Sequence, residues 1–288
     1  MSGEVWSLWV DCRLCGSRDL RVLFTATRSG RQVVRCRGCG LVFYDPQPSP
    51  AQAAALYSSD YFAREYPAET EEGQTRLAHR RLTRIEMEAG VGSLLDAGCG
   101  AGRFLAVART RGWKAAGLDV SPSAVQLAAT TSGAPVYEGD LGRPLPPGQA
   151  PVDVVTMWDT LEHLANPVAA LAETTRWLRP GGLLVIQTQN ANSVTAAWMG
   201  RRWEQFVEFH LYHFSPWALR LALERAGLAA VRIEDADQFG DAGRASPSPA
   251  HGFRAVLGRL RDRAWVLAGH DAFNVMIATA RRPARGTA

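Results

Sequence analysis

A glycine-rich turn at residues 98–102 constrains the fold more than any other part of this chain. Residues 94–97 before it are apolar apart from one acid, Asp96, and predict a buried strand, while residues 103–111 predict a helix. Glycine has no side chain and readily adopts positive φ, so a nucleoside can lie against such a turn. The glycines stand at 98, 100 and 102, and position 103 is arginine, which excludes the G-x-G-x-x-G spacing of a dinucleotide-binding turn.

Further segments that predict strands with nearby acids follow this turn. Residues 115–120 contain Asp119, residues 136–141 contain Asp140, and residues 152–158 lead into Asp159. A carboxylate at the end of the second strand can accept hydrogen bonds from both hydroxyls of a ribose. An aspartate after a strand also commonly caps a helix, so both interpretations of Asp119 and Asp140 stay open on the residues alone.

These segments, which cover residues 92–190, resemble the motifs of the class I S-adenosylmethionine-dependent methyltransferases, with residues 98–102 as motif I. The resemblance implies a Rossmann-like α/β fold, with a seven-stranded, mostly parallel sheet, an antiparallel last strand and helices on both faces. It also implies that S-adenosylmethionine binds at the carboxyl ends of the first strands. The residues that it assigns to the cofactor are Asp96, Ala97, Gly98, Gly100, Gly102, Asp119, Val120, Gly139, Asp140, Leu141, Trp158 and, from an aromatic segment before the core, Tyr61.

Four cysteines near the N-terminus form the pattern C-x2-C-x20-C-x2-C, with glycine after each pair. Two such pairs can present four thiolates to one tetrahedral ion, and we predict structural Zn2+, with iron as the alternative. The expected zinc ribbon occupies residues 1–45 and contains a hairpin. Because a domain of ~45 residues rarely has a sufficient core, we expect its folding to depend on the metal. The predicted ligands are Cys12, Cys15, Cys36 and Cys39.

The composition bounds the remaining possibilities. The 288 residues carry a formal net charge of +4, a mild excess that does not demand nucleic acid. No apolar run approaches the ~18 residues needed to cross a bilayer, and the N-terminus lacks signal-peptide features, so we expect a cytoplasmic protein without membrane contact. Residues 46–90 are predicted to be a linker and helices that cover the cofactor. Residues 91–288 are predicted to be the methyltransferase domain, with an insertion at 240–271 as a substrate lid or a plain surface helix.

The candidate catalytic residues follow the fourth and fifth strands. Methyl transfer from a sulfonium is an in-line displacement, in which the protein aligns the acceptor and, where needed, removes a proton. Histidine suits proton removal near neutral pH, and the candidates are His163, His210 and His213. We expect His163 or His210 to be the base, with Asp159 and Glu208 as carboxylate alternatives. The resemblance also gives the His163 position a role in closing the cofactor pocket, and an acceptor that is already nucleophilic needs no base.

Residues 210–215 resemble a segment in a subgroup of bacterial methyltransferases that also carry a four-cysteine N-terminal domain. Members of this subgroup are often found with surface-polysaccharide and natural-product pathways. We therefore predict an enzyme that methylates a small molecule, with a hydroxyl of a sugar or natural-product intermediate as the expected acceptor and with carbon and nitrogen acceptors left open. The alternative is an RNA methyltransferase whose arginine-rich ribbon binds RNA, although residues 158–161 lack an Asn-Pro-Pro-Tyr-like tetrapeptide. A non-catalytic scaffold is a third interpretation, which the intact glycine turn argues against.

Overall fold

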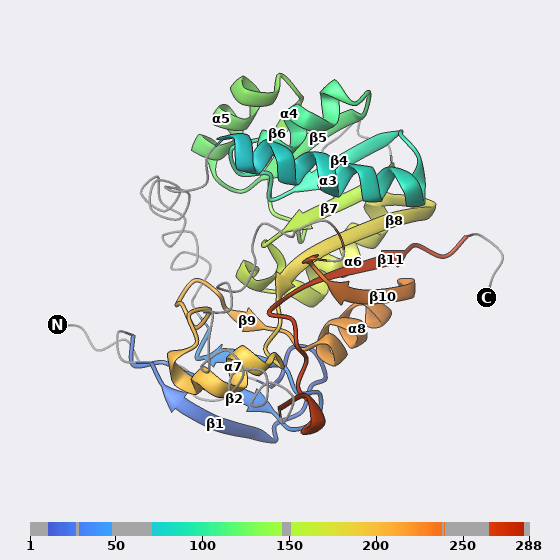
Figure 1. The fold of residues 1–288 in the computed structure, drawn as a ribbon. Coiled ribbons are helices and arrows are strands. Elements are labelled where there is room, and N and C mark those ends of the chain that lie inside the picture. The colour runs from blue at the N-terminus through green and yellow to red at the C-terminus, as the bar shows by residue number, and fades with distance from the viewer. Residues whose placement is uncertain are drawn as a thin grey trace, which may run out of the picture.

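The computed structural model describes residues 11–26, 29–47, 71–145, 151–237, 239 and 265–284. These residues form two β-sheets with helices packed against them (Figure 1). Tyr61 and most of the two expected lids, at 46–90 and 240–271, lie outside the described residues. The roles given to them therefore stay predictions.

The larger sheet has seven strands in the order β10-β11-β8-β7-β4-β5-β6. The strands from β6 to β8 are parallel, and β11 pairs antiparallel with both β8 and β10. The predicted mostly parallel, seven-stranded sheet with an antiparallel last strand is confirmed. The strands are β4 Ser93–Ala97, β5 Lys114–Asp119, β6 Val136–Glu138, β7 Val152–Trp158, β8 Leu178–Gln189, β10 Ala229–Asp235 and β11 Val275–Arg281.

Continuous apolar runs explain why the parallel strands lie in the centre. Leu94, Leu95 and Ala97 of β4 are buried, as is every residue from 183 to 186 of β8. A strand covered on both faces needs apolar residues at successive positions and not only at alternate ones. One face is covered by α3 (Glu71–Ala89), α4 (Arg103–Thr110) and α5 (Pro122–Ser132), and the other by α6 (Pro167–Trp177) and α8 (Pro216–Arg225).

Side-chain caps fix where several helices begin. The side chains of Ser121, Asn166 and Ser215 each accept a hydrogen bond from a backbone N–H three residues later, and proline follows each cap. Shorter helical elements are η1 (Leu161–His163), α7 (Val194–Met199) and η2 (Gly200–Arg202). No helix within the described ranges is both long enough and apolar enough to span a membrane.

The smaller sheet joins the N-terminal domain to the rest of the chain. Its order is β1-β2-β3-β9, where the first three strands are Leu20–Thr25, Gln32–Cys36 and Val42–Asp45, and β9 is Tyr212–His213. The hairpin of β1 and β2 lies where the sequence predicts it. The sequence does not predict β9, which pairs antiparallel with β3.

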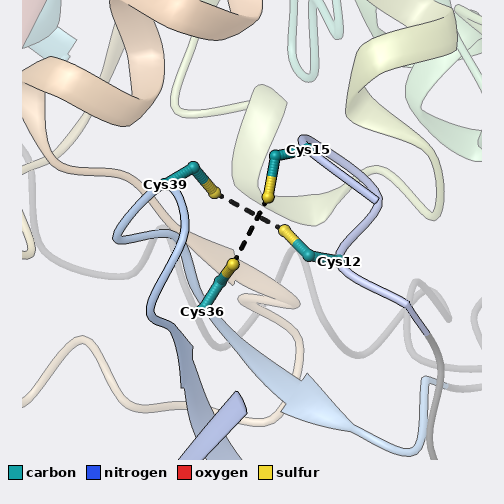
Figure 2. Close-up of side chains that lie close together, drawn as sticks. All are labelled: Cys12, Cys15, Cys36 and Cys39. Carbon is teal, nitrogen blue, oxygen red and sulfur yellow. Dashed lines mark hydrogen bonds between the residues drawn. The ribbon is translucent and has the colours of Figure 1, made fainter. Parts of the chain in front are cut away.

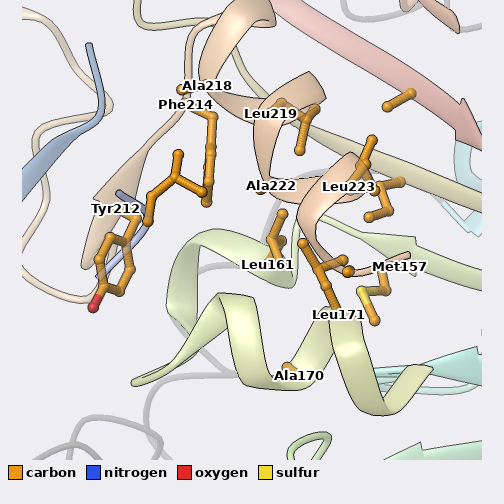
Figure 3. Close-up of a cluster of buried hydrophobic side chains, with 14 of the residues drawn as sticks. Met157, Leu161, Ala170, Leu171, Tyr212, Phe214, Ala218, Leu219, Ala222 and Leu223 are labelled. Carbon is orange, nitrogen blue, oxygen red and sulfur yellow. The ribbon is translucent and has the colours of Figure 1, made fainter. Parts of the chain in front are cut away.

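One hydrophobic cluster connects the two sheets. It contains Leu41 and Phe43 of the small sheet, Tyr212 and Phe214, and residues of α6 and α8. Figure 3 shows Tyr212 and Phe214 beside the apolar side chains of α8. The N-terminal domain is therefore packed onto the larger one through a continuous core.

Candidate active site

The turn between β4 and α4 needs glycine at two positions. Gly98 and Gly102 have φ of 78° and 75°, in the left-handed region. A Cβ on Gly98 would lie 2.5 Å from the side chain of Thr160, and a Cβ on Gly102 would lie 2.7 Å from the Cα of Ala128. The turn therefore places backbone without side chains at the start of α4, and a ligand can pack against it.

Two buried acids flank the turn. Asp96 on β4 is 2% exposed and accepts a hydrogen bond from Thr156 Oγ1 at 2.7 Å, and burial raises its pKa to about 7. Asp119 accepts from the backbone N–H of Gly100 at 2.9 Å and of Ser121 at 3.0 Å, while burial raises its pKa. A carboxylate oxygen accepts more than one hydrogen bond, so Asp119 can hold the turn and still accept from a ribose.

The other predicted cofactor residues lie at the same edge of the sheet. The backbone N–H of Gly139 donates to the carbonyl of Asp119 at 2.9 Å, and the exposed Asp140 accepts from the N–H of Gly142 at 2.9 Å. Their contact with a cofactor stays a prediction. The residues that the fold gathers at the carboxyl ends of β4 to β7 are Asp96, Ala97, Gly98, Gly100, Gly102, Asp119, Val120, Gly139, Asp140, Leu141 and Trp158.

Arg81 of α3 joins this edge, and sequence reasoning did not predict it. Its guanidinium lies 4.0 Å from the ring centroid of Trp158, and it donates to Gln187 Oε1 at 2.7 Å. Gln187 in turn donates to Asp159 Oδ2 at 2.8 Å. Trp158 Nε1 is buried and has no hydrogen-bond partner among the described residues, so it can donate to a bound ligand.

The signal for Arg81 was present in the sequence. The buried residues of α3 are Ala78, Arg81, Leu82 and Ile85, which fall at i, i+3, i+4 and i+7 on one helix face. An arginine on the apolar face of a helix indicates a buried partner, because a guanidinium is rarely buried without one. Likewise, the run of polar residues at the end of β8, which includes Gln187, indicates a site at that end.

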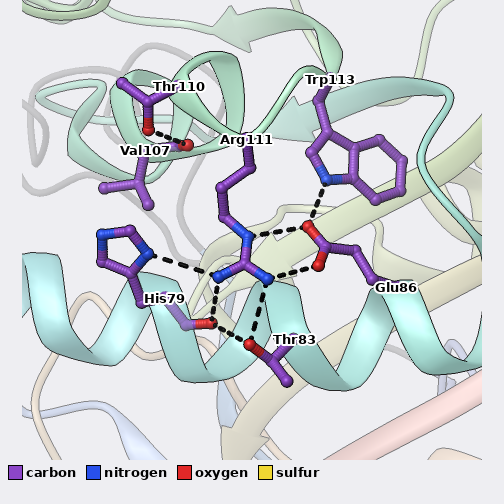
Figure 4. A network of polar contacts seen from close by, with 7 residues as sticks. All are labelled: His79, Thr83, Glu86, Val107, Thr110, Arg111 and Trp113. Atoms are coloured by element: carbon purple, nitrogen blue, oxygen red, sulfur yellow. Dashed lines mark hydrogen bonds and ion pairs between the residues drawn. The ribbon is translucent and has the colours of Figure 1, made fainter.

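A polar network holds α3 against the end of α4 (Figure 4). Arg111 donates from Nε to Glu86 Oε1 at 2.8 Å and pairs with the second oxygen of the same carboxylate. Trp113 Nε1 donates to Glu86 Oε1 at 3.1 Å, and Arg111 also reaches Thr83 Oγ1 at 3.1 Å. The Arg111 hydrogen bond lowers the pKa of Glu86. This network fixes the helix that carries Arg81.

The rings of His163, in η1, and His210 meet with their centroids 4.8 Å apart, and we call η1 and the residues just before it, 159–163, the floor of the site. Nδ1 of His163 is 3.1 Å from the carbonyl of Phe209, and Nδ1 of His210 is 3.0 Å from the carbonyl of Gln205. A carbonyl only accepts, so each Nδ1 carries a proton, and Nε2 is the basic nitrogen of each neutral ring. His163 also has a backbone hydrogen bond with Asp159. Burial lowers the pKa of His163 to about 3 and that of His210 to about 4, so both rings are neutral at pH 7.

Asp159 and Glu162 lie between these histidines and the sheet. Asp159 has φ of 51°, which is uncommon for a residue with a Cβ, and such strain is found at functional sites. Glu162 is fully buried and accepts from Thr188 Oγ1 at 3.0 Å and from Gln189 Nε2. Burial, together with the charge of Asp159, raises the pKa of Glu162 to about 8. These bonds tie η1 to the end of β8.

His213 faces the N-terminal domain. It is fully buried, with its ring centroid 4.8 Å from that of Phe206 and 6.0 Å from that of Tyr44. Neither ring nitrogen has a hydrogen-bond partner among the described residues, and burial lowers its pKa well below the ordinary value. The backbone carbonyl of Glu208 also meets that domain, at Arg31, while its side-chain Oε1 is buried without a hydrogen-bond partner among the described residues. The ring contacts of His213 are those of a packed residue, so they favour His163 and His210 over His213 as candidate bases.

The four predicted metal ligands converge on one point (Figure 2). The Sγ atoms of Cys12 and Cys39 are 3.5 Å apart, and those of Cys15 and Cys36 are 3.4 Å apart. A tetrahedron with metal–sulfur bonds of ~2.3 Å has edges of about 3.8 Å, so the free thiols fit one ion with a small adjustment. A second group with ligand atoms within 4.8 Å of one another is Glu162, His163 and His210.

Known proteins resemble this chain in sequence. A family model described as a methyltransferase domain matches residues 63–233. Malonyl-[acyl-carrier protein] O-methyltransferase of Serratia marcescens is 35% identical over 144 residues, which are 49% of this chain and 53% of that protein. Ubiquinone biosynthesis O-methyltransferase of Cereibacter sphaeroides is 33% identical over 116 residues, 38% of this chain and 47% of that protein. The chain thus spans about half the length of these curated relatives.

Solved structures resemble the fold. An S-adenosylmethionine-dependent methyltransferase of Archaeoglobus fulgidus superposes with a TM-score of 0.54 at 17% identity, covering 78% of this chain and 99% of that one. The plantazolicin methyltransferase BpumL, in complex with SAH, gives a TM-score of 0.53 at 18% identity, covering 80% of this chain and 93% of that one. At these identities the likeness establishes the fold alone.

Proposed function

Because this chain belongs to the family of class I S-adenosylmethionine-dependent methyltransferases, we propose that it transfers a methyl group to a hydroxyl of a small molecule, in the class of sugar or natural-product intermediates. The observation that carries the proposal is the junction of two features. The glycine turn with Asp96 and Asp119 lies at the same sheet edge as two neutral histidines. A nucleoside site and a proton acceptor side by side are what O-methylation requires.

The chain's own residues have separate tasks in this proposal. S-adenosylmethionine supplies an electrophilic methyl carbon bonded to sulfur. Asp119 would accept hydrogen bonds from its ribose, and Trp158, held by Arg81, would close the cofactor site beside the turn. Nε2 of His163 or His210 would accept the proton of the acceptor hydroxyl, which makes its oxygen nucleophilic toward that methyl group. Asp159 is the carboxylate alternative for proton removal.

The choice of acceptor is supported by chemistry and by relatives. A neutral histidine is needed for a hydroxyl and not for an acceptor that is already a strong nucleophile. Two relatives of this chain are O-methyltransferases by name, one acting on malonyl-[acyl-carrier protein] and one in ubiquinone biosynthesis. Neither name refers to a nucleic acid, which is consistent with a small-molecule acceptor for this chain.

We propose that Cys12, Cys15, Cys36 and Cys39 hold Zn2+ in a structural role, within an N-terminal domain of residues 1–45. Four thiolates fill a tetrahedral shell and leave no position for water or substrate. Elemental analysis of the purified chain distinguishes zinc from iron. Visible absorption is a second test, because a four-thiolate iron site is coloured and a zinc site is not.

RNA is the alternative acceptor, and the placement of the ribbon arginines bears on it. Arg31 is buried in the contact with the larger domain. Arg18 is paired with Asp11 and Arg37 with Asp19. Arginines that face carboxylates of their own domain present less positive charge to a phosphate backbone, so these contacts favour the small-molecule proposal.

The test is transfer of labelled methyl from S-adenosylmethionine into an extract of the source organism, followed by size fractionation and nuclease treatment. The proposal expects label in a small-molecule fraction that nuclease does not change. Label in a large, nuclease-sensitive fraction would replace it with the RNA alternative. An Asp159→Asn variant assayed alongside tests the carboxylate alternative.

A further inference from the structure

The segment that carries His210 is also part of the four-cysteine domain's sheet. β9 begins two residues after His210 and pairs with β3, with Val42 opposite His213 and Phe43 opposite Tyr212. The N–H of Tyr44 also donates to the carbonyl of Leu211 at 3.1 Å. Backbone hydrogen bonds therefore join the segment that carries His210 directly to the small domain.

Arg31 makes a second connection between the same two parts. It is 7% exposed and lies 4.7 Å from the ring centroid of Tyr44. Its Nη1 donates to the carbonyl of Glu208 at 3.3 Å, and its Nε donates to the carbonyl of Pro46 at 2.9 Å. A planar guanidinium with fixed donors in two directions holds two backbone segments at a set spacing.

Aromatic rings fill the remaining space on this side. The centroids of Phe24 and Phe206 are 4.9 Å apart, and those of Trp203 and Phe206 are 5.1 Å apart. Ring pairs at these separations add attraction beyond the area that they bury. We define residues 205–214 as the bridging segment, because this chain of contacts holds one side of it on the small domain.

The other side of the bridging segment contacts the floor of the active site. The carbonyl of Phe209 meets His163 Nδ1 at 3.1 Å, and Tyr212 Oη donates to the carbonyl of Ala165 at 3.2 Å. The His210 ring lies against the His163 ring. Both candidate bases therefore contact a segment that the small domain holds on its other side.

We propose that the metal-loaded four-cysteine domain is the outer wall of the acceptor site, and that it positions His210 by holding the bridging segment. The glycine turn and its acids make their contacts within the larger domain and do not depend on the metal. Loss of the metal therefore disorders the acceptor side and leaves the cofactor side intact. The catalytic consequence rests on the proposed function, but the structural claim does not.

The first experiment compares the full chain before and after metal removal with a chelator. Amide hydrogen exchange of peptides covering 205–214 should become at least about tenfold faster, because a domain this small opens without its metal. Affinity for S-adenosylhomocysteine, measured by calorimetry, should change by less than about twofold. Unchanged exchange at 205–214, or a parallel loss of S-adenosylhomocysteine binding, would overturn the proposal.

Arg31→Gln keeps all four cysteines and tests the same connection in a metal-loaded chain. We expect the imidazole ¹⁵N signals of His210 to shift, while those of His79 on the exposed face of α3 do not. Arg21→Gln is the matched control, since Arg21 is exposed on β1 of the same domain. Unshifted His210 signals in Arg31→Gln, or equal shifts in Arg21→Gln, would contradict a positioning role.

These readouts separate the two claims. If the proposed function fails, methyl label from S-adenosylmethionine does not enter the small-molecule fraction, whatever the exchange at 205–214 shows. If only this inference fails, S-adenosylhomocysteine binds, but metal removal does not change hydrogen exchange at 205–214 and Arg31→Gln does not shift the His210 signals.

Discussion

In the proposed site, the contacts of the cofactor side and those of the acceptor side join residues at different separations along the chain. Gly100 and Asp119, which join the glycine turn to the next strand, are 19 residues apart. Arg81 and Gln187, which link the two sides, are 106 residues apart, and Arg31 and Glu208, on the acceptor side, are 177 apart. The cofactor side is thus a product of consecutive strand–turn–helix units, while the acceptor side is assembled from segments that only the completed fold brings together.

The residues proposed to bind the cofactor are therefore largely different from those proposed to act on the methyl acceptor. Backbone geometry and two buried acids make the cofactor side, and these features tolerate little change. Side chains from η1, β8, the bridging segment and the small domain make the acceptor side. A change of acceptor can alter the acceptor-side residues while the cofactor-side residues stay the same. Membership of the family therefore says little about which acceptor is methylated.

The largest expected effect breaks the acceptor side alone. Replacing the base, by His210→Ala or His163→Ala, should lower kcat by about 10²–10⁴-fold and leave S-adenosylhomocysteine affinity nearly unchanged. Because burial lowers the pKa of His210 to about 4, a His210 base keeps the rate level from pH 6 to 8 and loses it only below about pH 5. Steady-state rates with the acceptor isolated from extract measure both. Full activity in both variants would remove the histidines from the mechanism.

The next effect breaks the cofactor side. Gly98→Ala should lower the free energy of unfolding by about 2–4 kcal/mol, because it adds both a strained φ and a clash with Thr160. Gly90→Ala is the matched control, since Gly90 also has positive φ but has open space around it, and should cost about 1 kcal/mol. Denaturant titration measures the two values. Equal losses would show that the contact with Thr160 is unimportant.

A smaller effect tests the link between the two sides. Arg81→Met removes the charged donor to Gln187 and the contact with Trp158, and should weaken S-adenosylhomocysteine binding by about tenfold, or about 1.4 kcal/mol. Arg76→Met, on the exposed face of the same helix, serves as the control. Calorimetry gives both dissociation constants, and equal values would confine Arg81 to a structural role.

The smallest effect concerns the support of α3. Glu86 has its pKa lowered by Arg111, so the pair stabilises the fold above the ordinary glutamate pKa of about 4.3 and loses that contribution as pH falls below it. Because both side chains are partly exposed, Glu86→Gln should cost only about 0.5–1 kcal/mol at pH 7 and less at pH 3. Thermal unfolding at both pH values provides the comparison. A cost that is larger at pH 3 would contradict this sign.

Sequence reasoning reached the parts of the molecule that local patterns encode. These are the glycine spacing, the acids at the ends of β4 and β5, and the two cysteine pairs. Each depends on residues close together in the sequence or, for the cysteines, on four residues of the same type. Arg81 was missed because its charge conceals its place on the buried face of α3, and β9 was missed because a two-residue strand has no periodicity. The contrast between His210 and His213 was also beyond the sequence, since only the pairing of β9 with β3 shows which ring faces the small domain.

We expect this fold to bind S-adenosylmethionine through the glycine turn and Asp119. Calorimetry can compare the binding of S-adenosylhomocysteine to the full chain, to Asp119→Ala and to the control Glu138→Ala, which alters an exposed acid at the end of β6. We predict binding to the unaltered chain and to Glu138→Ala, and a dissociation constant raised by about 100-fold or more in Asp119→Ala, since two hydrogen bonds to a charged group are lost. An unaltered chain that does not bind, or an Asp119→Ala variant that binds equally well, would contradict the account.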